Sequence, residues 1–293
     1  MNKRQNKEKQ RFEGFYFKQQ NKDETVAFIA ARHSGEDSRP LASLQIITDA
    51  EAFNVDFPAE QFFDDRKRLI VRLGNSIFSK NGVSLNIERP ELSLYGKLSF
   101  GTLALPAYDI MGPFAAVPFM ECRHSVYSLF HKVNGCVTIN GREYKFLDGS
   151  GYIEGDRGTS FPKRYIWTHC CFNGNSIMMS LADIPVGPFS FIGCTGFIYL
   201  NGKERRIATY LGGGPLHIGQ DCVILRQGGL MLEIRLLKEN SYPLYAPKQG
   251  RMTSIIHESA SCMVRYKCSE YGKVIFDFIS EHASFENNWM NVQ

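Results

Sequence analysis

Residues 76–87 have the sequence Ser-Ile-Phe-Ser-Lys-Asn-Gly-Val-Ser-Leu-Asn-Ile. Short stretches with apolar side chains flank the Asn81-Gly82 pair, and apolar and polar residues alternate over 83–87, as in a β-strand that buries one face. Asn and Gly tolerate the positive φ angles that a type I′ turn requires. This stretch therefore predicts a β-hairpin.

The same Asn-Gly pair recurs twice within a repeat. Residues 135–143, Gly-Cys-Val-Thr-Ile-Asn-Gly-Arg-Glu, match residues 196–204, Gly-Phe-Ile-Tyr-Leu-Asn-Gly-Lys-Glu, at an offset of 61 (196 − 135). Both stretches predict hairpins. An internal duplication and two unrelated hairpins with the same turn chemistry both explain the match, and the sequence leaves the choice open.

Strand-like stretches follow one another along the rest of the chain, with turn residues between them. The further predicted strands are residues 12–18, 26–31, 41–47, 69–73, 125–131, 166–172, 207–211, 222–226, 230–238, 263–268 and 273–280. Only residues 58–65, which begin with Pro and carry acidic side chains, have the pattern of a short helix. The sequence thus predicts an all-β barrel or sandwich, and the absence of βαβ alternation argues against a doubly wound nucleotide-binding fold.

The chain has 293 residues and a formal net charge of +4. Residues 1–11 hold five basic side chains and one acidic side chain, a net of +4, so residues 12–293 sum to zero (4 − 4). We expect residues 1–11 to be a disordered basic tail. Nucleic acid is not expected as a partner, because a nucleic-acid-binding protein of this size carries a basic face on its folded part.

The N-terminal residues are charged and polar and lack the apolar run of a secretory signal. The most apolar window, residues 177–200, contains Asp183, Pro185 and Pro188, so no transmembrane segment is expected. The eight cysteines show no CxxC spacing and are expected to be reduced. We therefore expect a cytoplasmic protein. The sequence leaves open transient contact with a membrane surface and the oligomeric state.

Residues 151–162 carry side chains suited to acid–base chemistry. In an extended strand, Tyr152, Glu154 and Asp156 point to one face. If both carboxyls are buried there, repulsion between them keeps one protonated near neutral pH and provides a general acid. Alternatively, the two acids pair with basic residues between positions 157 and 164 and fix a corner of the sheet.

The pattern at residues 151–162, Gly-Tyr-Ile-Glu-x-Asp-x-Gly-x-Ser-Phe-Pro, resembles the tocopherol cyclase family. Arg157 stands where many members of that family have an aromatic residue. Further matches run from about residue 12 to the end of the chain. They are residues 14–18 (Gly-Phe-Tyr-Phe-Lys), 27–29 (Ala-Phe-Ile), 75–79 (Asn-Ser-Ile-Phe-Ser), 112–114 (Gly-Pro-Phe), 118–124 (Pro-Phe-Met-Glu-Cys-Arg-His), 126–128 (Val-Tyr-Ser) and Trp167.

The resemblance implies two lipocalin-like (calycin) antiparallel β-barrel domains, similar to those of carotenoid hydratase-type proteins. We expect an N-terminal domain over residues 12–119 and a C-terminal domain over residues 120–293, which carries the 151–162 motif. The resemblance also implies a reaction that closes a chromanol ring. A phenol adds across the double bond of a prenyl group under acid catalysis, with no redox change, no cofactor and no metal.

Such a reaction needs a proton donor, groups that stabilise a tertiary cation, and an apolar cavity. We expect Glu154 or Asp156 to be the acid and His124 to accept or orient the phenol proton. The residues expected to bind the substrate are Tyr127, Tyr152, Trp167 and His131. A hydrogen-bonded structural role is the alternative for each histidine.

A hydrophobic or prenylated small molecule is thus the expected partner. The alternative is a non-catalytic carrier of a lipid or another hydrophobic ligand, because a barrel can hold an apolar molecule without chemistry. A carbohydrate-binding sandwich is a third hypothesis, and it predicts that Trp167 and Trp289 lie on exposed faces. Glu121, Cys122 and His124 could converge on a metal, but no recognised zinc spacing supports this.

Overall fold

Most of the chain lies in β-strands. The computed structural model describes residues 11–34, 39–117, 120–186 and 188–289, which contain 21 β-strands and three short 3-10 helices. The all-β prediction is confirmed. Apart from Arg11, the basic tail expected over residues 1–11 lies outside the described residues. Within the described ranges, none of the helices has the length and apolarity that crossing a membrane would require.

The first half of the molecule is an antiparallel sheet with the strand order β4-β3-β2-β1-β11-β10-β9-β8-β7-β6-β5. Its strands are β1 (Phe12–Gln20), β2 (Thr25–Ser34), β3 (Pro40–Thr48), β4 (Ala52–Pro58), β5 (Phe62–Asp65), β6 (Ile70–Leu73), β7 (Ser76–Ser79), β8 (Gly82–Arg89), β9 (Leu92–Phe100), β10 (Cys122–Ile139) and β11 (Arg142–Gly158). The 3-10 helix η1 (Ala59–Gln61) separates β4 from β5, and η2 (Gly112–Ala116) precedes β10.

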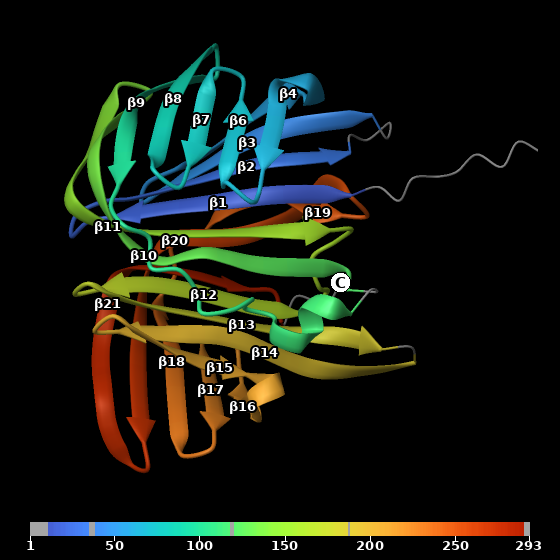
Figure 1. Cartoon of the computed structure of the whole chain (residues 1–293), viewed down its shortest axis with the longest axis vertical. Helices are drawn as coiled ribbons and strands as arrows, with labels where there is room; N and C mark the ends of the chain where they lie inside the picture. The colour runs from blue at the N-terminus through green and yellow to red at the C-terminus, as the bar shows by residue number, and fades with distance from the viewer. Residues whose placement is uncertain (1–10, 35–38, 118–119, 187, 290–293) are drawn as a thin grey trace, which may run out of the picture.

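The second half is also antiparallel, with the strand order β15-β14-β13-β12-β21-β20-β18-β17-β16. Its strands are β12 (Tyr165–Phe172), β13 (Asn175–Val186), β14 (Phe189–Leu200), β15 (Lys203–Ala208), β16 (Gly213–Ile218), β17 (Cys222–Gln227), β18 (Leu230–Lys238), β20 (Arg251–Glu270) and β21 (Lys273–Asn287). The 3-10 helix η3 (Thr209–Leu211) lies between β15 and β16. In Figure 1 the first half lies above the second, and β10, β11 and β12 run where the two halves meet.

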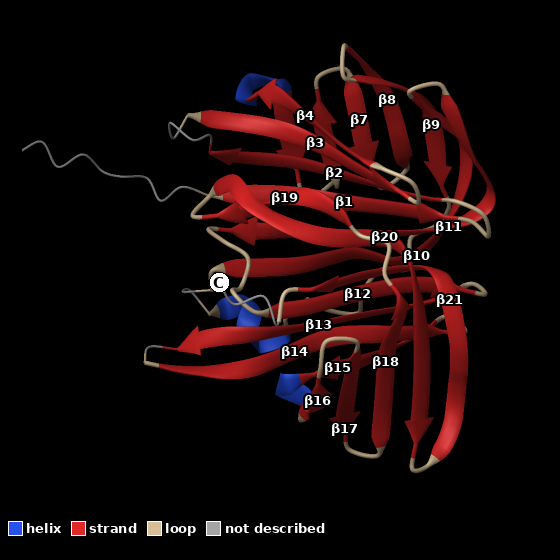
Figure 2. Ribbon diagram, turned by 180° about the vertical axis from the view of Figure 1, so that it is seen from behind, coloured by secondary structure: helices blue, strands red, loops and turns tan. Residues whose placement is uncertain are grey.

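The long strand β20 joins the two halves into one hydrogen-bonded network of 21 strands among the described residues. Its first part pairs with β19 (Tyr242–Lys248), and its later part pairs with β18 and β21. One parallel pair, Ser34 with Arg251, connects β20 to β2 of the first half. In Figure 2, which shows the side opposite to Figure 1, β19 and β20 pass in front of the first half before the chain continues into the second.

The two closed barrels that the resemblance implies are not confirmed. Within the described residues, no backbone ladder joins β4 to β5 or β15 to β16, so neither half closes on itself by strand pairing. The helices η1 and η3 stand at these two places, and each turns the chain out of the ladder. Each half is therefore a curved sheet with an open edge.

Strand pairing does not follow the boundary expected at residues 119/120. The strands β10 and β11 come after that boundary, yet β10 pairs with β9 and β11 pairs with β1. The sheet of the first half therefore extends to Gly158. The division into domains over residues 12–119 and 120–293 remains a prediction about units that fold independently.

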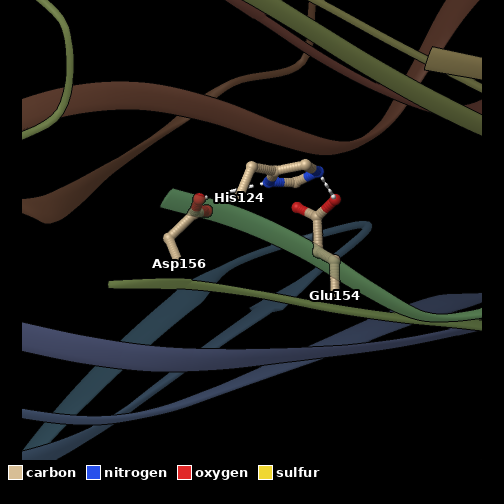
Figure 3. Close-up of side chains that lie close together, drawn as sticks. All are labelled: His124, Glu154 and Asp156. Carbon is tan, nitrogen blue, oxygen red and sulfur yellow. Dashed lines mark hydrogen bonds and ion pairs between the residues drawn. The ribbon is translucent and has the colours of Figure 1, made fainter. Parts of the chain in front are cut away.

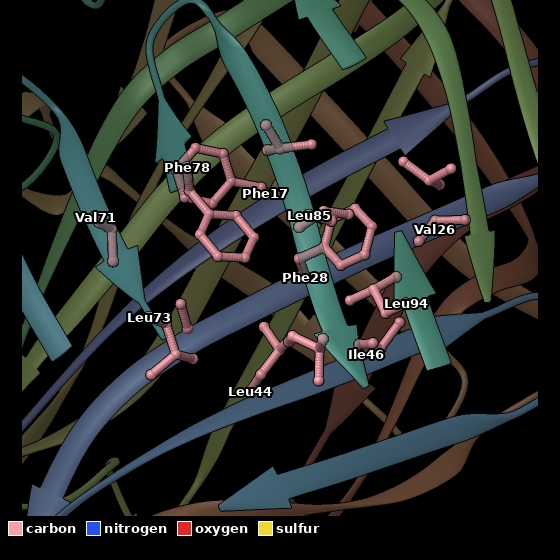
Figure 4. Packing of buried hydrophobic residues seen from close by; sticks show 14 of the residues in the cluster. Phe17, Val26, Phe28, Leu44, Ile46, Val71, Leu73, Phe78, Leu85 and Leu94 are labelled. Atoms are coloured by element: carbon pink, nitrogen blue, oxygen red, sulfur yellow. The ribbon is translucent and has the colours of Figure 1, made fainter. Parts of the chain in front are cut away.

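Buried side chains form three apolar clusters among the described residues. The first fills the inside of the first half and includes Phe17, Phe28, Leu44, Phe78 and Leu94 (Figure 4). The second fills the second half and includes Ile177, Leu232, Val264, Tyr266 and Phe285. The third joins the halves and includes Tyr16, Tyr152, Trp167, Met178 and Ile256. Because each large side chain contributes roughly 1.5–3 kcal/mol when fully buried, this third cluster holds the halves together.

The hairpin predicted over residues 76–87 is confirmed, but its turn differs from the expected type I′ turn. The turn residues are Lys80 and Asn81, and Gly82 is already the first residue of β8, with φ +140°. A Cβ atom at Gly82 would lie 2.0 Å from the carbonyl oxygen of Leu98. Glycine is therefore needed here because β8 and β9 approach each other closely, and its role is not to form a left-handed turn.

Both copies of the repeat form hairpins with the expected turn. Asn140 and Gly141 have φ +48° and +85°, and Asn201 and Gly202 have φ +50° and +77°. Positive φ at both turn residues is the signature of the type I′ turn. One copy joins β10 to β11 and the other joins β14 to β15.

Candidate active site

A cavity of about 190 Å³ lies between the two halves. Strands β1, β2, β3, β10 and β11 line it from one side and β12, β13, β14, β20 and β21 from the other. Small residues, Gly14, Ala31, Ala182 and Gly193, are part of its wall. A single water molecule needs roughly 10–15 Å³ of such space. The cavity therefore has room for a small organic molecule.

Strand β11 presents its predicted acidic face to this cavity. Ile153 points into the core of the first half, while Tyr152 belongs to the cluster between the halves. Glu154 and Asp156 line the cavity, as strand alternation requires. The prediction that these three side chains share one face is confirmed.

His124 lies between the two carboxylates. In the pairing of β10 with β11 it is directly opposite Asp156, which places the two side chains on the same face. Its Nδ1 lies 3.1 Å from Oδ1 of Asp156, and its Nε2 lies 3.3 Å from Oε2 of Glu154. Figure 3 shows the imidazole ring with one nitrogen directed to each acid.

Two hydrogen-bond donors and the imidazolium of His124 converge on one oxygen of Glu154. Tyr152 donates a hydrogen bond from its hydroxyl to Oε2 over 2.6 Å, and Trp167 donates from Nε1 over 3.2 Å. The third group is the nearby Nε2 of His124. Because the three groups come from β10, β11 and β12, this carboxylate links the two halves at the wall of the cavity.

The two acids keep His124 charged. Burial acts to lower the pKa of His124, but the carboxylates of Glu154 and Asp156 outweigh it, and the pKa is raised well above its usual value. At neutral pH the ring is therefore an imidazolium that donates a hydrogen bond from Nδ1 to Asp156 and forms an ion pair with Glu154 on the Nε2 side. Cys122 also faces Asp156, with its Sγ 3.4 Å from Oδ1, and burial raises the pKa of this thiol.

Two further acids, Glu258 on β20 and Glu286 on β21, line the same cavity from the second half. Only 7% of Glu258 and 5% of Glu286 is exposed. The sequence analysis missed both residues. The only local signals are the small or apolar residues beside each acid, Ser-Ala-Ser-Cys at 259–262 and Ala-Ser-Phe at 283–285, which indicate a strand buried on both faces.

Burial keeps these two acids protonated. It raises the pKa of Glu286 to about 8, with a hydrogen bond from Tyr165 opposing the shift and Asp156 and Glu154 adding to it. Burial also raises the pKa of Glu258 well above its usual value, and the neighbouring Glu286 and Glu154 raise it further. The cavity thus contains protonated carboxyls opposite the Glu154–His124–Asp156 cluster.

Three of the four expected substrate-binding residues do not line the cavity, and two of them, Tyr127 and His131, belong to β10. Tyr127 points to the other side of β10 and stacks on Phe15, with ring centroids 6.0 Å apart. His131 is fully buried, and its Nδ1 lies 2.9 Å from Oγ of Ser128. Burial lowers the pKa of His131 to about 3, so it is a neutral structural histidine. Ordinary strand alternation puts Tyr127 on the face opposite His124 and Val126, and the register shifts of β10 lie between Val126 and His131.

Trp167 and Tyr152 occupy different positions relative to the cavity. Trp167 lines it, whereas Tyr152 lies behind Glu154 and stacks on His169 at a centroid distance of 3.9 Å. Trp167 is 7% exposed and Trp289 is 8% exposed. The carbohydrate-binding hypothesis predicted exposed tryptophans, and this prediction is wrong, because both rings pack into apolar clusters.

His124, Glu154 and Asp156 offer ligand-type atoms within 4.8 Å of one another, a spacing that can hold a metal ion. The two ring nitrogens of His124 face different carboxylates, however, so a single imidazolium already satisfies both acids. The arrangement fits a proton-bearing histidine better than a metal ligand. Cys122 donates to Asp156 and does not form a ligand group with Glu121 in the described residues.

No known protein family and no curated protein sequence matches this chain. Solved structures share its fold over nearly the whole length. The AttH-type protein NE1406 from Nitrosomonas europaea superposes with a TM-score of 0.56 and 13% identity, over 96% of this chain and 93% of that protein. The protein CghA gives a TM-score of 0.63 and 11% identity, over 97% and 90% of the two chains, and its complex with Sch210972 gives 0.62. At these identities the likeness shows a shared β-rich, lipocalin-like fold alone.

Proposed function

We propose that this protein binds a small, mostly apolar molecule in the cavity between its halves and closes a ring in it by proton transfer. The observation that carries the proposal is the burial of Glu258 and Glu286 in the wall of a largely apolar cavity, where burial raises the pKa of both carboxyls. A protonated acid in a dry site is the general acid that addition to an alkene requires. The reaction is an isomerisation, so it calls for no redox partner.

The proton donor in this proposal is Glu258 or Glu286, and not Glu154 or Asp156. The carboxyl O–H bond breaks as a C–H bond forms on the alkene, which leaves a tertiary cation and a carboxylate. The hydroxyl oxygen of the same substrate then forms a C–O bond with the cation. Its proton passes to Glu154 or Asp156, or back to the donor, so no atoms and no electrons are lost.

The other groups of the site orient and stabilise. As an imidazolium, His124 hydrogen-bonds to Asp156 and forms an ion pair with Glu154, so we assign it the role of positioning these acids. The sequence suggested instead that it accepts or orients the phenol proton. The indole of Trp167 and the ring of Tyr16 both line the cavity, and their centroids lie 5.5 Å from each other. Such aromatic rings can stabilise a cation.

The substrate class that we propose is a prenylated aromatic, or another isoprenoid that carries an alkene and a hydroxyl. The resemblance of residues 151–162 to the tocopherol cyclase family supports this choice. The fold shared with CghA, which has been solved in complex with the small molecule Sch210972, supports the binding of a small organic ligand. That second support is an analogy of fold.

A non-catalytic carrier is the second candidate. The largely apolar lining of the cavity favours it, because such a wall binds a hydrophobic ligand whether or not a proton is transferred. The two functions differ in what the acids do. A carrier needs the shape of the cavity, whereas a cyclase also needs a proton donor.

Incubation of the purified protein with prenylated hydroquinones of several chain lengths tests the proposal. We expect a product of unchanged mass that has lost one of its two phenolic hydroxyls and one alkene, while the second hydroxyl and any further alkenes of the chain remain. Glu258→Gln and Glu286→Gln should each retain ligand binding, and loss of the donor should lower turnover by about 10²–10⁴-fold. Binding without turnover in the wild-type protein would establish the carrier, and neither binding nor turnover would overturn both functions.

A further inference from the structure

The charges around the cavity do not balance. Four carboxyl groups line it, and burial favours the protonated, neutral forms of two of them, Glu258 and Glu286. The carboxylates of Glu154 and Asp156 then face a single basic side chain, since His124 is the only one among the described lining residues. We propose that the cavity selects ligands that join a positive charge to an apolar body, such as a hydrophobic amine or a quaternary ammonium compound. The inference rests on the proposed function only in using the same cavity, and it specifies the ligand class.

The Glu154–His124–Asp156 cluster retains a negative charge. The imidazolium offsets one of the two carboxylates that it faces, at 3.3 Å and 3.1 Å, and the other carboxylate is uncompensated within the cluster. The hydrogen bonds from Tyr152 and Trp167 to Glu154, and from Cys122 to Asp156, stabilise these carboxylates but bring no positive charge. A cation in the cavity would supply the missing countercharge.

Glu258 gives an independent indication of an absent partner. It lines the cavity with 7% of its surface exposed, and its Oε1 has no hydrogen-bond partner among the described residues. Buried carboxyl oxygens are almost always paired, because an unpaired one loses the hydrogen bonds that water would provide. A positively charged group in the cavity would satisfy this oxygen.

Aromatic rings complete the binding surface. The edge-to-face pair of Tyr16 and Trp167 lies on one side, and Phe161 contacts both Phe12 and Tyr165 at centroid distances of 5.5 Å and 5.8 Å. All five rings line the cavity. Aromatic faces surround quaternary ammonium groups in known binding sites, since the negative face of the ring attracts the cation.

The other titratable groups near Glu258 and Glu286 do not supply the countercharge. Burial raises the pKa of Tyr16 and of Tyr165, so both hydroxyls remain neutral. Lys18 does not line the cavity, and its Nζ donates to the carbonyl of His282 and to Oγ of Ser284, each over 2.8 Å. Its charge acts to lower the pKa of Glu258, but burial and the neighbouring Glu286 and Glu154 outweigh it. The cavity therefore keeps its acidic character.

Binding of a permanent cation should release protons. A positive charge beside Glu258 and Glu286 favours their ionised forms, so the bound state holds fewer protons than the free protein. By linkage, affinity should then increase as the pH rises toward about 8, where Glu286 titrates in the free protein. A quaternary ammonium ligand does not titrate, so the pH dependence would belong to the protein.

Two ligands of the same shape test the inference. Benzyltrimethylammonium carries a positive nitrogen where neopentylbenzene has a carbon atom. Calorimetry at neutral pH should show at least about tenfold tighter binding of the cation, because only the cation gains from the carboxylates and the ring faces. Equal affinity for the two ligands, or preference for the neutral one, would overturn the inference.

Variants and pH assign the effect to the acids. Glu258→Gln should weaken cation binding about tenfold and leave neopentylbenzene within about twofold, because the neutral ligand makes only apolar contacts. The exposed Glu91→Gln is the matched control and should change neither affinity. If Glu258→Gln does not fold, a pH series on the wild-type protein still decides. Affinity for the cation should rise from about pH 6 to about pH 8, and a flat or falling profile contradicts the proposal.

The outcome is separable from that of the proposed function. A protein that binds benzyltrimethylammonium selectively but cyclises no prenylated phenol overturns the enzymatic proposal and supports this one. A protein that cyclises the phenol but prefers neopentylbenzene supports the enzymatic proposal and overturns the inference about cations.

Discussion

Glu154 is held in place by partners on its own strand and on two neighbouring strands. Oε2 of this carboxylate accepts hydrogen bonds from Tyr152 and Trp167 and forms an ion pair with His124. Hydrogen bonds to a charged group contribute about 1.5–3 kcal/mol each, so a wall residue of the cavity is fixed by contacts that also join the halves. The residues that shape the site are therefore residues that stabilise the fold.

Replacement of Tyr152 by Phe should destabilise the protein by roughly 1.5–3 kcal/mol, because it removes the donor 2.6 Å from Glu154. Tyr127→Phe is the matched control, since that ring lies on the other face of β10, and it should change stability by less than about 0.5 kcal/mol. Urea-induced unfolding at neutral pH measures both values. Equal losses in the two variants would show that the Tyr152–Glu154 bond contributes nothing specific.

Glu286→Gln should alter how stability depends on pH. Burial raises the pKa of Glu286 to about 8 from 4.5, so the folded protein holds an extra proton between these values and loses stability as the pH rises through them. The variant lacks this loss. The stability of the variant relative to wild type should therefore increase between about pH 4.5 and about pH 8, by ~2–4 kcal/mol in the free energy of unfolding. Melting temperatures of the two proteins across this pH range measure the change. Glu91→Gln serves as the control, and a pH-independent difference for Glu286→Gln would contradict the shift.

At the scale of single elements, local patterns predicted strands well. The hairpin over residues 76–87, the two hairpins of the repeat and the acidic face of β11 follow from alternation and from turn chemistry. Elsewhere the local pattern misled. Residues 58–65 form one turn of η1 followed by β5, and residues 207–211 leave β15 for η3, because these segments meet the open edges of the sheets.

Close packing of strands explains why several glycines are needed. A Cβ atom at Gly96 (φ +130°) would lie 2.4 Å from the carbonyl oxygen of Cys136 on β10, whereas one at Gly174 (φ +75°) would meet nothing within 4 Å. Gly96→Ala should therefore cost more than about 3 kcal/mol of stability, and Gly174→Ala about 1–2 kcal/mol for its backbone conformation alone. Thermal or urea unfolding separates the two. Similar losses would mean that the β9–β10 ladder adjusts freely to a methyl group.

At the scale of the whole molecule, the cavity depends on the pairing of distant segments. Glu258 and Glu286 reach the acids of β11 only because β20 and β21 pack against the first half. No local pattern encodes that arrangement, so the sequence predicted Glu154, Asp156, His124 and Trp167 beside one another but missed the two acids opposite them. Alternation predicted on which face of a strand each side chain lies. Which side chains lie opposite that face depends on how the two halves pack.

We expect the two halves to unfold in one transition. The cluster between them and the continuous strand β20 couple them, and strand pairing runs across the boundary at residues 119/120. Calorimetry should give a single peak whose van't Hoff and calorimetric enthalpies agree. Two resolved peaks would instead support independent domains over residues 12–119 and 120–293.

The central claim is that carboxyls in the cavity between the halves remain protonated at neutral pH. Infrared spectroscopy measures this directly, because protonated and ionised carboxyl groups absorb at different frequencies. We predict a protonated-carboxyl band in the wild-type protein at neutral pH that is reduced in Glu258→Gln and in Glu286→Gln and unchanged in Glu91→Gln. A wild-type spectrum with ionised carboxylates only, or a protonated band that neither cavity variant reduces, would contradict the account.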